Sequence, residues 1–157
     1  MILGTQWGDA KVGFVEIDLV AHCGETTAGE YVNTLDVTDV CSGRTETASV
    51  INKAQKHVFK ALLDIRERLP FLLLGIDSDN GSEFINHELY RYCNQENICF
   101  TRSRPYKKND GCHVEQKNWS IVRRNIGYER YESQLFYFEA IRPSFANHNL
   151  KKQPDML

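Results

Sequence analysis

Several features are missing from this 157-residue sequence, and the absences narrow the class of protein. The longest apolar run is far shorter than the roughly 20 residues that a membrane-spanning helix needs. The N-terminus has no signal-peptide pattern, and no segment is repeated. We therefore expect a cytoplasmic protein that makes no contact with a membrane.

Cysteine pairing signals are also missing. The five cysteines are odd in number and form no C-x-x-C pair; they lie at positions 23, 41, 93, 99 and 112. This pattern predicts reduced thiols. The pairs His22-Cys23 and Cys112-His113 leave a zinc site open as an alternative, but neither has the spacing of zinc ligands. Small buried thiols are the favoured interpretation.

The length, the 41% apolar share and the 25% charged share predict one soluble globular domain. The net charge of −2 conceals an uneven distribution. Residues 1–50 carry eight acids and two bases, whereas residues 101–124 carry seven bases and two acids. A basic segment of this kind indicates a polyanionic partner, with a solvated helix face as the alternative.

Hydrophobic periodicity predicts the element order β-β-β-α-β-α-β-α. Strands are expected at residues 12–20, 31–40, 44–48, 71–79 and 98–101, and helices at 50–69, from Ser82 onward and at 112–126. Together they predict an α/β (α+β) fold with a mixed five-stranded sheet flanked by helices. Residues 1–11 are expected to be a lead-in, 12–141 the core domain, and 142–157 a poorly ordered tail.

Carboxylates occur where an apolar strand is expected to end. The run Phe71-Leu72-Leu73-Leu74 leads through Ile76 to Asp79 and a turn at Asn80-Gly81. Within the strand at 12–20, the two-residue period places Glu16 and Asp18 on one face. An unpaired carboxylate at such a position costs several kcal/mol to desolvate, which a bound cation offsets. Asp79 is therefore a candidate metal ligand, and two further carboxylates fit the same site: Asp18 on the earlier strand and Glu115 on the basic helix.

The sequence resembles the catalytic cores of transposases and retroviral-type integrases. The resemblance rests on Ile17-Asp18, then Asp79-Asn80-Gly81-Ser82-Glu83-Phe84, then Glu115 after thirty-five intervening residues. The segments 102–110 and 113–118 look like those of bacterial insertion-sequence transposases. The resemblance covers about residues 12–132 and implies the ribonuclease H-like fold with an Asp–Asp–Glu metal site.

This resemblance implies a mechanism with two Mg²⁺ ions, for which Mn²⁺ can substitute, held by Asp18, Asp79 and Glu115. Two ions about 3.5–4 Å apart assist in-line displacement at a phosphate, which gives DNA strand cleavage with water and strand transfer with a 3′-hydroxyl. The expected DNA-binding residues are Arg102, Arg104, Tyr106, Lys107, Lys108, Lys117, Arg123 and Arg124.

Some neighbouring residues are weaker candidates for metal binding or DNA contact. Glu16 and Asp77 are less favoured as ligands than Asp18 and Asp79. Tyr106 is suited to stacking on a base, although an ordinary loop aromatic is as good an interpretation. His113 is either a residue that orients Glu115 or a phosphate, or an ordinary surface histidine. Trp119 is expected to belong to the core.

Three functions remain open. The leading hypothesis is a transposase or integrase core that integrates and recombines DNA, works as a homo-oligomer on element ends and target DNA, and is nucleoid-associated. It would need a full-length transposase or a separate DNA-binding domain as a partner, because no helix-turn-helix is found before Val12. The alternatives are a metal-dependent ribonuclease H-like nuclease and a non-catalytic remnant that only binds DNA or a full-length partner.

Overall fold

The computed structural model describes residues 2–3, 11–78, 87–102 and 112–134. The strands are β1 (Ile2–Leu3), β2 (Phe14–Ala21), β3 (Asn33–Asp39), β4 (Thr45–Val50), β5 (Gly75–Ser78) and β6 (Cys99–Arg102). The helices are α1 (Gln55–Arg68), α2 (His87–Gln95), α3 (Cys112–Lys117), the π-helical segment η2 (Asn118–Arg123) and α4 (Arg124–Ile126). No helix among the described residues is long and apolar enough to cross a membrane.

The strands form one mixed sheet in the order β1-β6-β5-β2-β3-β4. The strands β2, β3 and β4 are antiparallel neighbours, whereas β5 runs parallel to both β2 and β6. The five predicted strands and their order relative to the helices are confirmed, and β4 lies at one edge of the sheet. A sixth, two-residue strand lies within the predicted lead-in, where Ile2 and Leu3 pair with Thr101 and Arg102 of β6.

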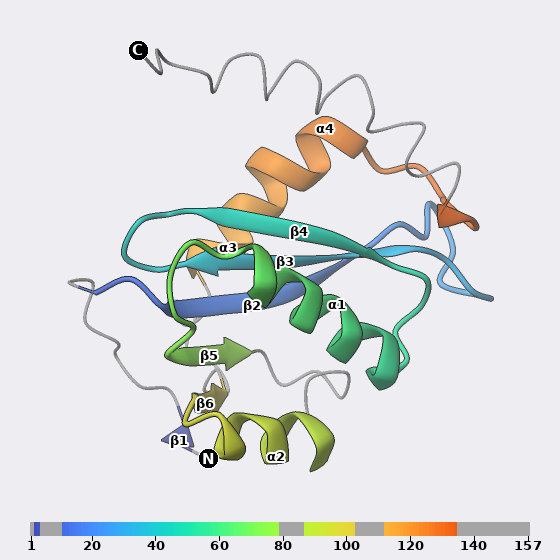
Figure 1. Ribbon diagram of the computed structural model, residues 1–157. Coiled ribbons are helices and arrows are strands. Elements are labelled where there is room, and N and C mark those ends of the chain that lie inside the picture. The colour runs from blue at the N-terminus through green and yellow to red at the C-terminus, as the bar shows by residue number, and fades with distance from the viewer. Residues whose placement is uncertain (1, 4–10, 79–86, 103–111, 135–157) are drawn as a thin grey trace.

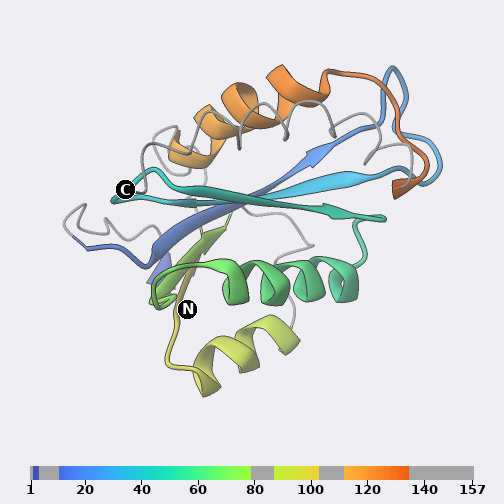
Figure 2. The same cartoon turned by 45° about the horizontal axis from the view of Figure 1, so that its top comes forward.

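Helices cover both faces of the sheet. Helices α1 and α2 lie on one face, and α3, η2 and α4 follow one another across the other (Figures 1 and 2). The main core fills the space between the sheet and the first pair of helices. It is built from apolar residues of β2, β3, α1, β5, α2 and β6, among them Val15, Ile17, Leu35, Ile65 and Ile76.

The alternation along β2 divides its side chains between the two layers. Val15 and Ile17 are buried in the main core. Because successive side chains of a strand point to opposite faces, Glu16 and Asp18 face the layer that holds α3. The central position of β2, with β5 on one side and β3 on the other, therefore puts carboxylates beneath a helix.

Two predicted boundaries are wrong. Helix α1 begins at Gln55 rather than residue 50, because Ser49 and Val50 pair with Thr34 and Asn33 as the end of β4. The strand predicted from Phe71 begins only at Gly75, and Leu72 is 78% exposed. Glycine is needed at that first position, since a Cβ there would come within 2.6 Å of Phe14 Cδ1.

The remaining predicted elements agree with the structure where it describes them. The helix predicted at 112–126 is continuous, although its middle segment, Asn118–Arg123, is π-helical. Leu89 and Cys93 form the buried stripe of α2. The predicted turn at Asn80-Gly81, the cap at Ser82, most of the basic loop and the tail from residue 142 lie outside the described residues.

A buried histidine lies just after the C-terminal end of β2. The His22 side chain is fully buried, with its Nε2 2.7 Å from Thr34 Oγ1 and its ring edge against Tyr131. Burial lowers the pKa of His22 from 6.5 to about 4, and the positive charge of Arg123 acts in the same direction. The imidazole is therefore neutral in the folded protein at pH 7.

We expect His22 to make stability pH-dependent. As pH falls below 6.5, the unfolded imidazole binds a proton that the folded one binds only near pH 4, so the free energy of unfolding falls across this window. The pKa difference corresponds to at most about 3 kcal/mol. Urea unfolding of wild type and His22→Gln at pH 7, 5.5 and 4.5 measures it, and the variant should lose less stability on acidification.

The control is His87→Gln, at an exposed position of α2. This variant should follow the wild-type pH dependence, because its side chain loses little solvation on folding. An unchanged pH dependence in His22→Gln would contradict the assignment.

Candidate metal and nucleic-acid site

Asp18 is held from two directions. It is half-buried in β2, and its Oδ1 accepts the Leu19 backbone N–H at 2.8 Å. Its Oδ2 accepts the side-chain amide of Asn118 at 2.8 Å, across 100 residues of sequence. The carboxylate therefore has a fixed orientation, set by its own strand and by the first residue of η2.

Glu16 anchors the same helix one turn earlier. Its side chain is 7% exposed, and its Oε2 accepts the backbone N–H of Val114 at 2.9 Å. Burial raises the pKa of Glu16, while the Val114 N–H and the nearby His113 act in the opposite direction. One oxygen of Glu16 thus satisfies a backbone donor in the first turn of α3. Glu16, a less favoured candidate ligand, therefore has a structural role.

Glu115 follows Val114 directly and is exposed on α3. The helix that carries it packs on β2 and β3, on the face toward which Glu16 and Asp18 point. The structure therefore brings Asp18 and the helix of Glu115 together. The third predicted ligand, Asp79, lies outside the described residues; Ser78 before it pairs with Ile17, the residue before Asp18.

A further acid, Asp36, was missed by sequence reasoning. It pairs directly with Asp18 across β2 and β3, is completely buried, and accepts the hydroxyl of Thr38 at 3.0 Å. Its Oδ2 has no hydrogen-bond partner among the described residues. Burial raises the pKa of Asp36 to about 7; the Thr38 hydroxyl opposes this, the Asp18 charge adds to it, and Lys117 opposes it.

Asp77 has a partner of its own. It lies between Glu16 and Thr101 in the strand register, and Thr101 Oγ1 donates to its Oδ1 at 2.5 Å. Because the Asp77 carboxylate accepts this hydrogen bond within the sheet, it has a structural role. The preference for Asp79 over Asp77 stays a prediction, because Asp79 lies outside the described residues.

The predicted DNA-binding residues lie in different surroundings. Arg123 donates to the carbonyls of Ala21 at 2.9 Å and Gly127 at 3.3 Å and lies over the Tyr128 ring, so its guanidinium has structural partners. Arg124 is exposed, and Lys117 is half-buried above the turn at Gly43. Arg102 ends β6 beside Ser78.

Four other predicted contacts, Arg104, Tyr106, Lys107 and Lys108, lie outside the described residues. His113 is half-buried and acts electrostatically on Glu16. The prediction that Trp119 belongs to the core is wrong, because its side chain is 61% exposed. The helical pattern did not reveal the exposure of Trp119. Trp119 lies four residues after Glu115, and core residues of a helix recur at the same spacing.

The described acids suit a hard cation. Asp18, Asp36 and Glu115 offer only carboxylate oxygens, the ligands that Mg²⁺ prefers, and the buried Oδ2 of Asp36 accepts no hydrogen bond from any residue that the structure describes. In the described part of the chain, no three histidine, cysteine, aspartate or glutamate side chains form a group that could hold a metal. The predicted set is complete only with Asp79, which is outside that part.

The thiols do not form a zinc centre in the described ranges. Cys93 is buried, Cys23 and Cys99 are half-buried, and Cys41 is exposed; all four are free thiols. Of the predicted small buried thiols, only Cys93 is therefore fully buried. Cys112 falls outside the side chains that the structure describes.

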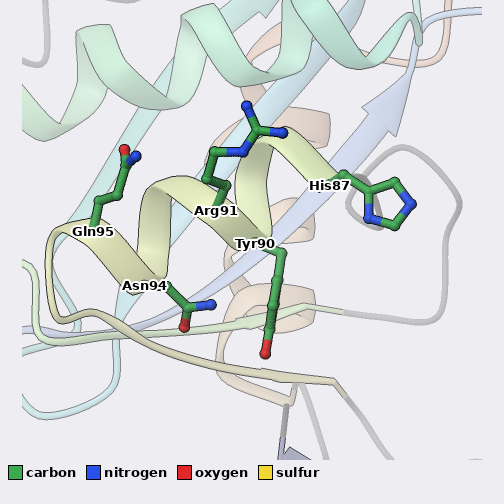
Figure 3. A pocket seen from close by; sticks show the side chains of 5 residues that line it. All are labelled: His87, Tyr90, Arg91, Asn94 and Gln95. Carbon is green, nitrogen blue, oxygen red and sulfur yellow. The ribbon is translucent and has the colours of Figure 1, made fainter.

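A surface depression of about 480 Å³ lies elsewhere, along the outer side of α2 (Figure 3). It is lined by His87, Tyr90, Arg91, Asn94 and Gln95. These residues lie along one side of a single helix, on the opposite face of the sheet from α3 (Figure 1). No carboxylate lines it, so it is not the candidate site.

The chain is similar to known integrases. The family model described as the integrase core domain matches residues 9–108. The uncharacterized protein y4rM of Sinorhizobium fredii is 44% identical over 152 residues, which is 88% of this chain and 43% of that protein. The chain thus spans less than half the length of this relative.

Solved structures with a similar fold include three chains of retroviral integrases. A chain of a simian T-cell lymphotropic virus intasome matches with a TM-score of 0.70 at 18% identity, over 100% of this chain and 55% of that one. The catalytic core of BIV integrase has a TM-score of 0.59 at 18% identity, over 92% and 87%. The HTLV-2 integrase catalytic core in complex with magnesium has a TM-score of 0.61 at 17% identity, over 83% and 80%.

We expect the Asn118–Asp18 hydrogen bond to stabilise the fold. A hydrogen bond to a charged group contributes about 1.5–3 kcal/mol, so Asn118→Ala should lower the free energy of unfolding by about that amount or slightly less at this half-buried position. The effect should shrink when Asp18 is already asparagine, because the charge is gone. A double-mutant cycle by urea unfolding measures the coupling between the two residues.

The matched control is Asn125→Ala. Asn125 is exposed on the same helix, and its amide bonds only the Ile121 carbonyl of its own helix. Its loss should cost clearly less than the loss of Asn118. Equal effects of the two variants, or additive effects in the cycle, would mean that the contact with Asp18 contributes nothing specific.

Proposed function

The chain belongs to the integrase core domain family, whose members are metal-dependent polynucleotidyl transferases, and we propose that it performs DNA strand cleavage and strand transfer with Asp18, Asp79 and Glu115. The observation that carries this proposal is the attachment of the Glu115 helix to the strand of Asp18. Two hydrogen bonds, from Val114 to Glu16 and from Asn118 to Asp18, bring a candidate carboxylate from each end of the domain to one face of the sheet.

The carboxylates would hold two Mg²⁺ ions, with Mn²⁺ as a substitute. Bound divalent ions would supply Lewis-acid stabilisation of the attacking and leaving oxygens of an in-line displacement at phosphorus. The role of the chain is to hold the donor oxygens in place. Asn118 fixes the carboxylate plane of Asp18, and Glu16 fixes the start of the helix that presents Glu115.

The acid cluster favours a cation before any substrate arrives. Two carboxylates about 4 Å apart repel each other by roughly 1–4 kcal/mol at the effective dielectric of a protein surface or of water. Asp36 and Asp18 are opposed in the register, and the raised pKa of Asp36 reflects this repulsion in part. A divalent ion at Asp18 would relieve it.

Members of this family act on DNA and assemble as oligomers. For this chain we infer element ends and target DNA as substrates and a homo-oligomer on DNA as the working form. We also infer a full-length transposase or a separate DNA-binding domain as a partner; the chain spans 43% of the length of y4rM. An origin in a bacterial insertion sequence is consistent with the segments at 102–110 and 113–118.

The basic residues are inferred to contact phosphates. Arg124 is exposed at the start of α4, and Lys117 is the last residue of α3, the helix that carries Glu115. Arg102 ends a strand beside β5, the strand that leads to Asp79. Phosphate contacts from these positions would orient DNA on the carboxylates without reading its sequence.

Loss of any one carboxylate should abolish activity. Asp18→Asn, Asp79→Asn and Glu115→Gln should each reduce Mg²⁺-dependent nicking and strand transfer by more than about 100-fold, because each removes an oxygen ligand and several kcal/mol of stabilisation. Glu115→Gln should unfold at the same urea concentration as wild type, since Glu115 is exposed. Gel assays with end-labelled duplexes measure both products.

Asp77→Asn is the matched control, two residues before Asp79 in the sequence. Its Oδ1 accepts the Thr101 hydroxyl, a structural hydrogen bond, so most activity should survive. An inactive Asp77→Asn beside an active Asp79→Asn would place the ligand two residues earlier. Undiminished cleavage by Glu115→Gln would end the assignment of the site.

DNA affinity should depend steeply on salt. If four to six of the seven cations in 101–124 contact phosphates, the logarithm of affinity falls against the logarithm of salt concentration with a slope of roughly −4 to −5. Arg124→Ala should reduce the slope by about 1. Fluorescence anisotropy with matched and scrambled duplexes measures affinity and sequence preference, which should be small.

Lys60→Ala is the control for charge. Lys60 lies on α1, across the sheet from α3, where it pairs with Asp64. Its removal should leave the slope unchanged. An equal reduction of the slope by both variants would indicate a general charge effect instead of a defined DNA path.

A further inference from the structure

Trp119 is a large aromatic side chain in an unusual environment. It is 61% exposed, although a buried indole removes roughly 150–250 Å² from water. Glu115, four residues earlier, is exposed as well. Because residues four apart on a helix lie about 5–6 Å from each other at their Cβ atoms, the indole adjoins a candidate metal ligand.

The backbone that carries this ring is fixed. Val114 and Val122 are buried on the inner side of the helix, and Asn118 between them donates to Asp18. Arg123 donates to the Ala21 carbonyl at 2.9 Å, so η2 is attached to β2 at its first and last residues. A π-helical segment is uncommon and frequently marks a functional site. Here it presents an exposed tryptophan from a rigid support.

The position of Trp119 restricts what can cover it. A protein surface docked on this ring would also cover Glu115, which lies one turn away. A phosphate could then not reach the Glu115 carboxylate. A nucleotide next to the reacting phosphate would cover the ring and leave the carboxylate directed at that phosphate. The exposed cation Arg124 lies five residues further along the same helix. Its charge favours a phosphate of the same DNA strand at that point.

We propose that Trp119 is a stacking platform for an unpaired DNA base beside the phosphate on which Asp18 and Glu115 act. Every base has a flat π-face, so the platform accepts any base that has left the duplex. A paired base is stacked between its neighbours and is not available to it. Trp119 therefore selects DNA with splayed ends over fully paired DNA, an inference that rests on the proposed function.

The test uses two duplexes of the same length, one fully paired and one with three mismatched nucleotides at one end. The protein is Glu115→Gln, to prevent cleavage, with Trp7→Phe so that Trp119 is the only one of the two tryptophans left. Binding of the splayed duplex in Mg²⁺ should quench indole fluorescence more than binding of the paired one. Anisotropy with labelled DNA gives the affinities of both.

Replacing the ring should affect only the splayed duplex. Base–aromatic stacking is worth about 1–3 kcal/mol, so Trp119→Ala should weaken binding of the splayed duplex by about 5- to 150-fold and leave the paired one unchanged. Trp119→Phe should recover most of the difference. Tyr128→Ala is the control, because Tyr128 is a 68% exposed aromatic that lies under Arg123. It should not discriminate between the duplexes.

The possible outcomes distinguish a failure of the stacking proposal from a failure of the proposed DNA-processing function. Equal binding of both duplexes by wild type and Trp119→Ala would overturn the platform and leave the DNA-processing function standing. Failure to bind either duplex would overturn both. If Trp119→Ala instead dissociates a DNA-free oligomer in sedimentation and binds both duplexes as wild type does, the ring belongs to a protein interface and the platform is wrong.

Discussion

The arrangement of the site depends on two hydrogen bonds from one helix to two carboxylates of one strand. Val114 donates its backbone N–H to Glu16, and Asn118 donates its side-chain amide to Asp18. Both acids are on the same face of β2, two residues apart, and both donors are on the same side of the helix, four residues apart. The two periodicities match, so a single docking position satisfies both bonds. The location of Glu115 follows from that position.

This docking concentrates negative charge beneath the helix. Glu16 and Asp36 are buried, Asp18 is half-buried, and burial raises the pKa values of Glu16 and Asp36. Lys117 and His113 offset part of the charge from the helix side. A cluster in which acids outnumber nearby bases is costly without a counter-ion, and a divalent cation is the most compact one. The same charges that a metal would use therefore oppose the stability of the metal-free fold.

Much of this could be predicted from the sequence because β2 alternates so clearly. Val15 and Ile17 had to be buried, which placed Glu16 and Asp18 on the other face. The helix of Glu115 was equally clear, but its docking was not, because Asn118 and Val114 find their partners about 100 residues away. Asp36 was missed because its closeness to Asp18 depends on strand register. The exposure of Trp119 was missed because a tryptophan at helical spacing has the pattern of a core residue.

The two sides of the helix from α3 to α4 have different roles. Its inner side provides Val114, Asn118 and Val122, which pack on the sheet or bond to it, so this side fixes position. Its outer side carries Glu115 and Trp119, whose exposure contributes nothing to the stability of the fold. Burying the Trp119 indole would stabilise the domain, since an exposed indole forgoes a large apolar burial. Left in solvent on a helix that is hydrogen-bonded to β2 through Val114, Asn118 and Arg123, both side chains are presented to something that arrives from outside.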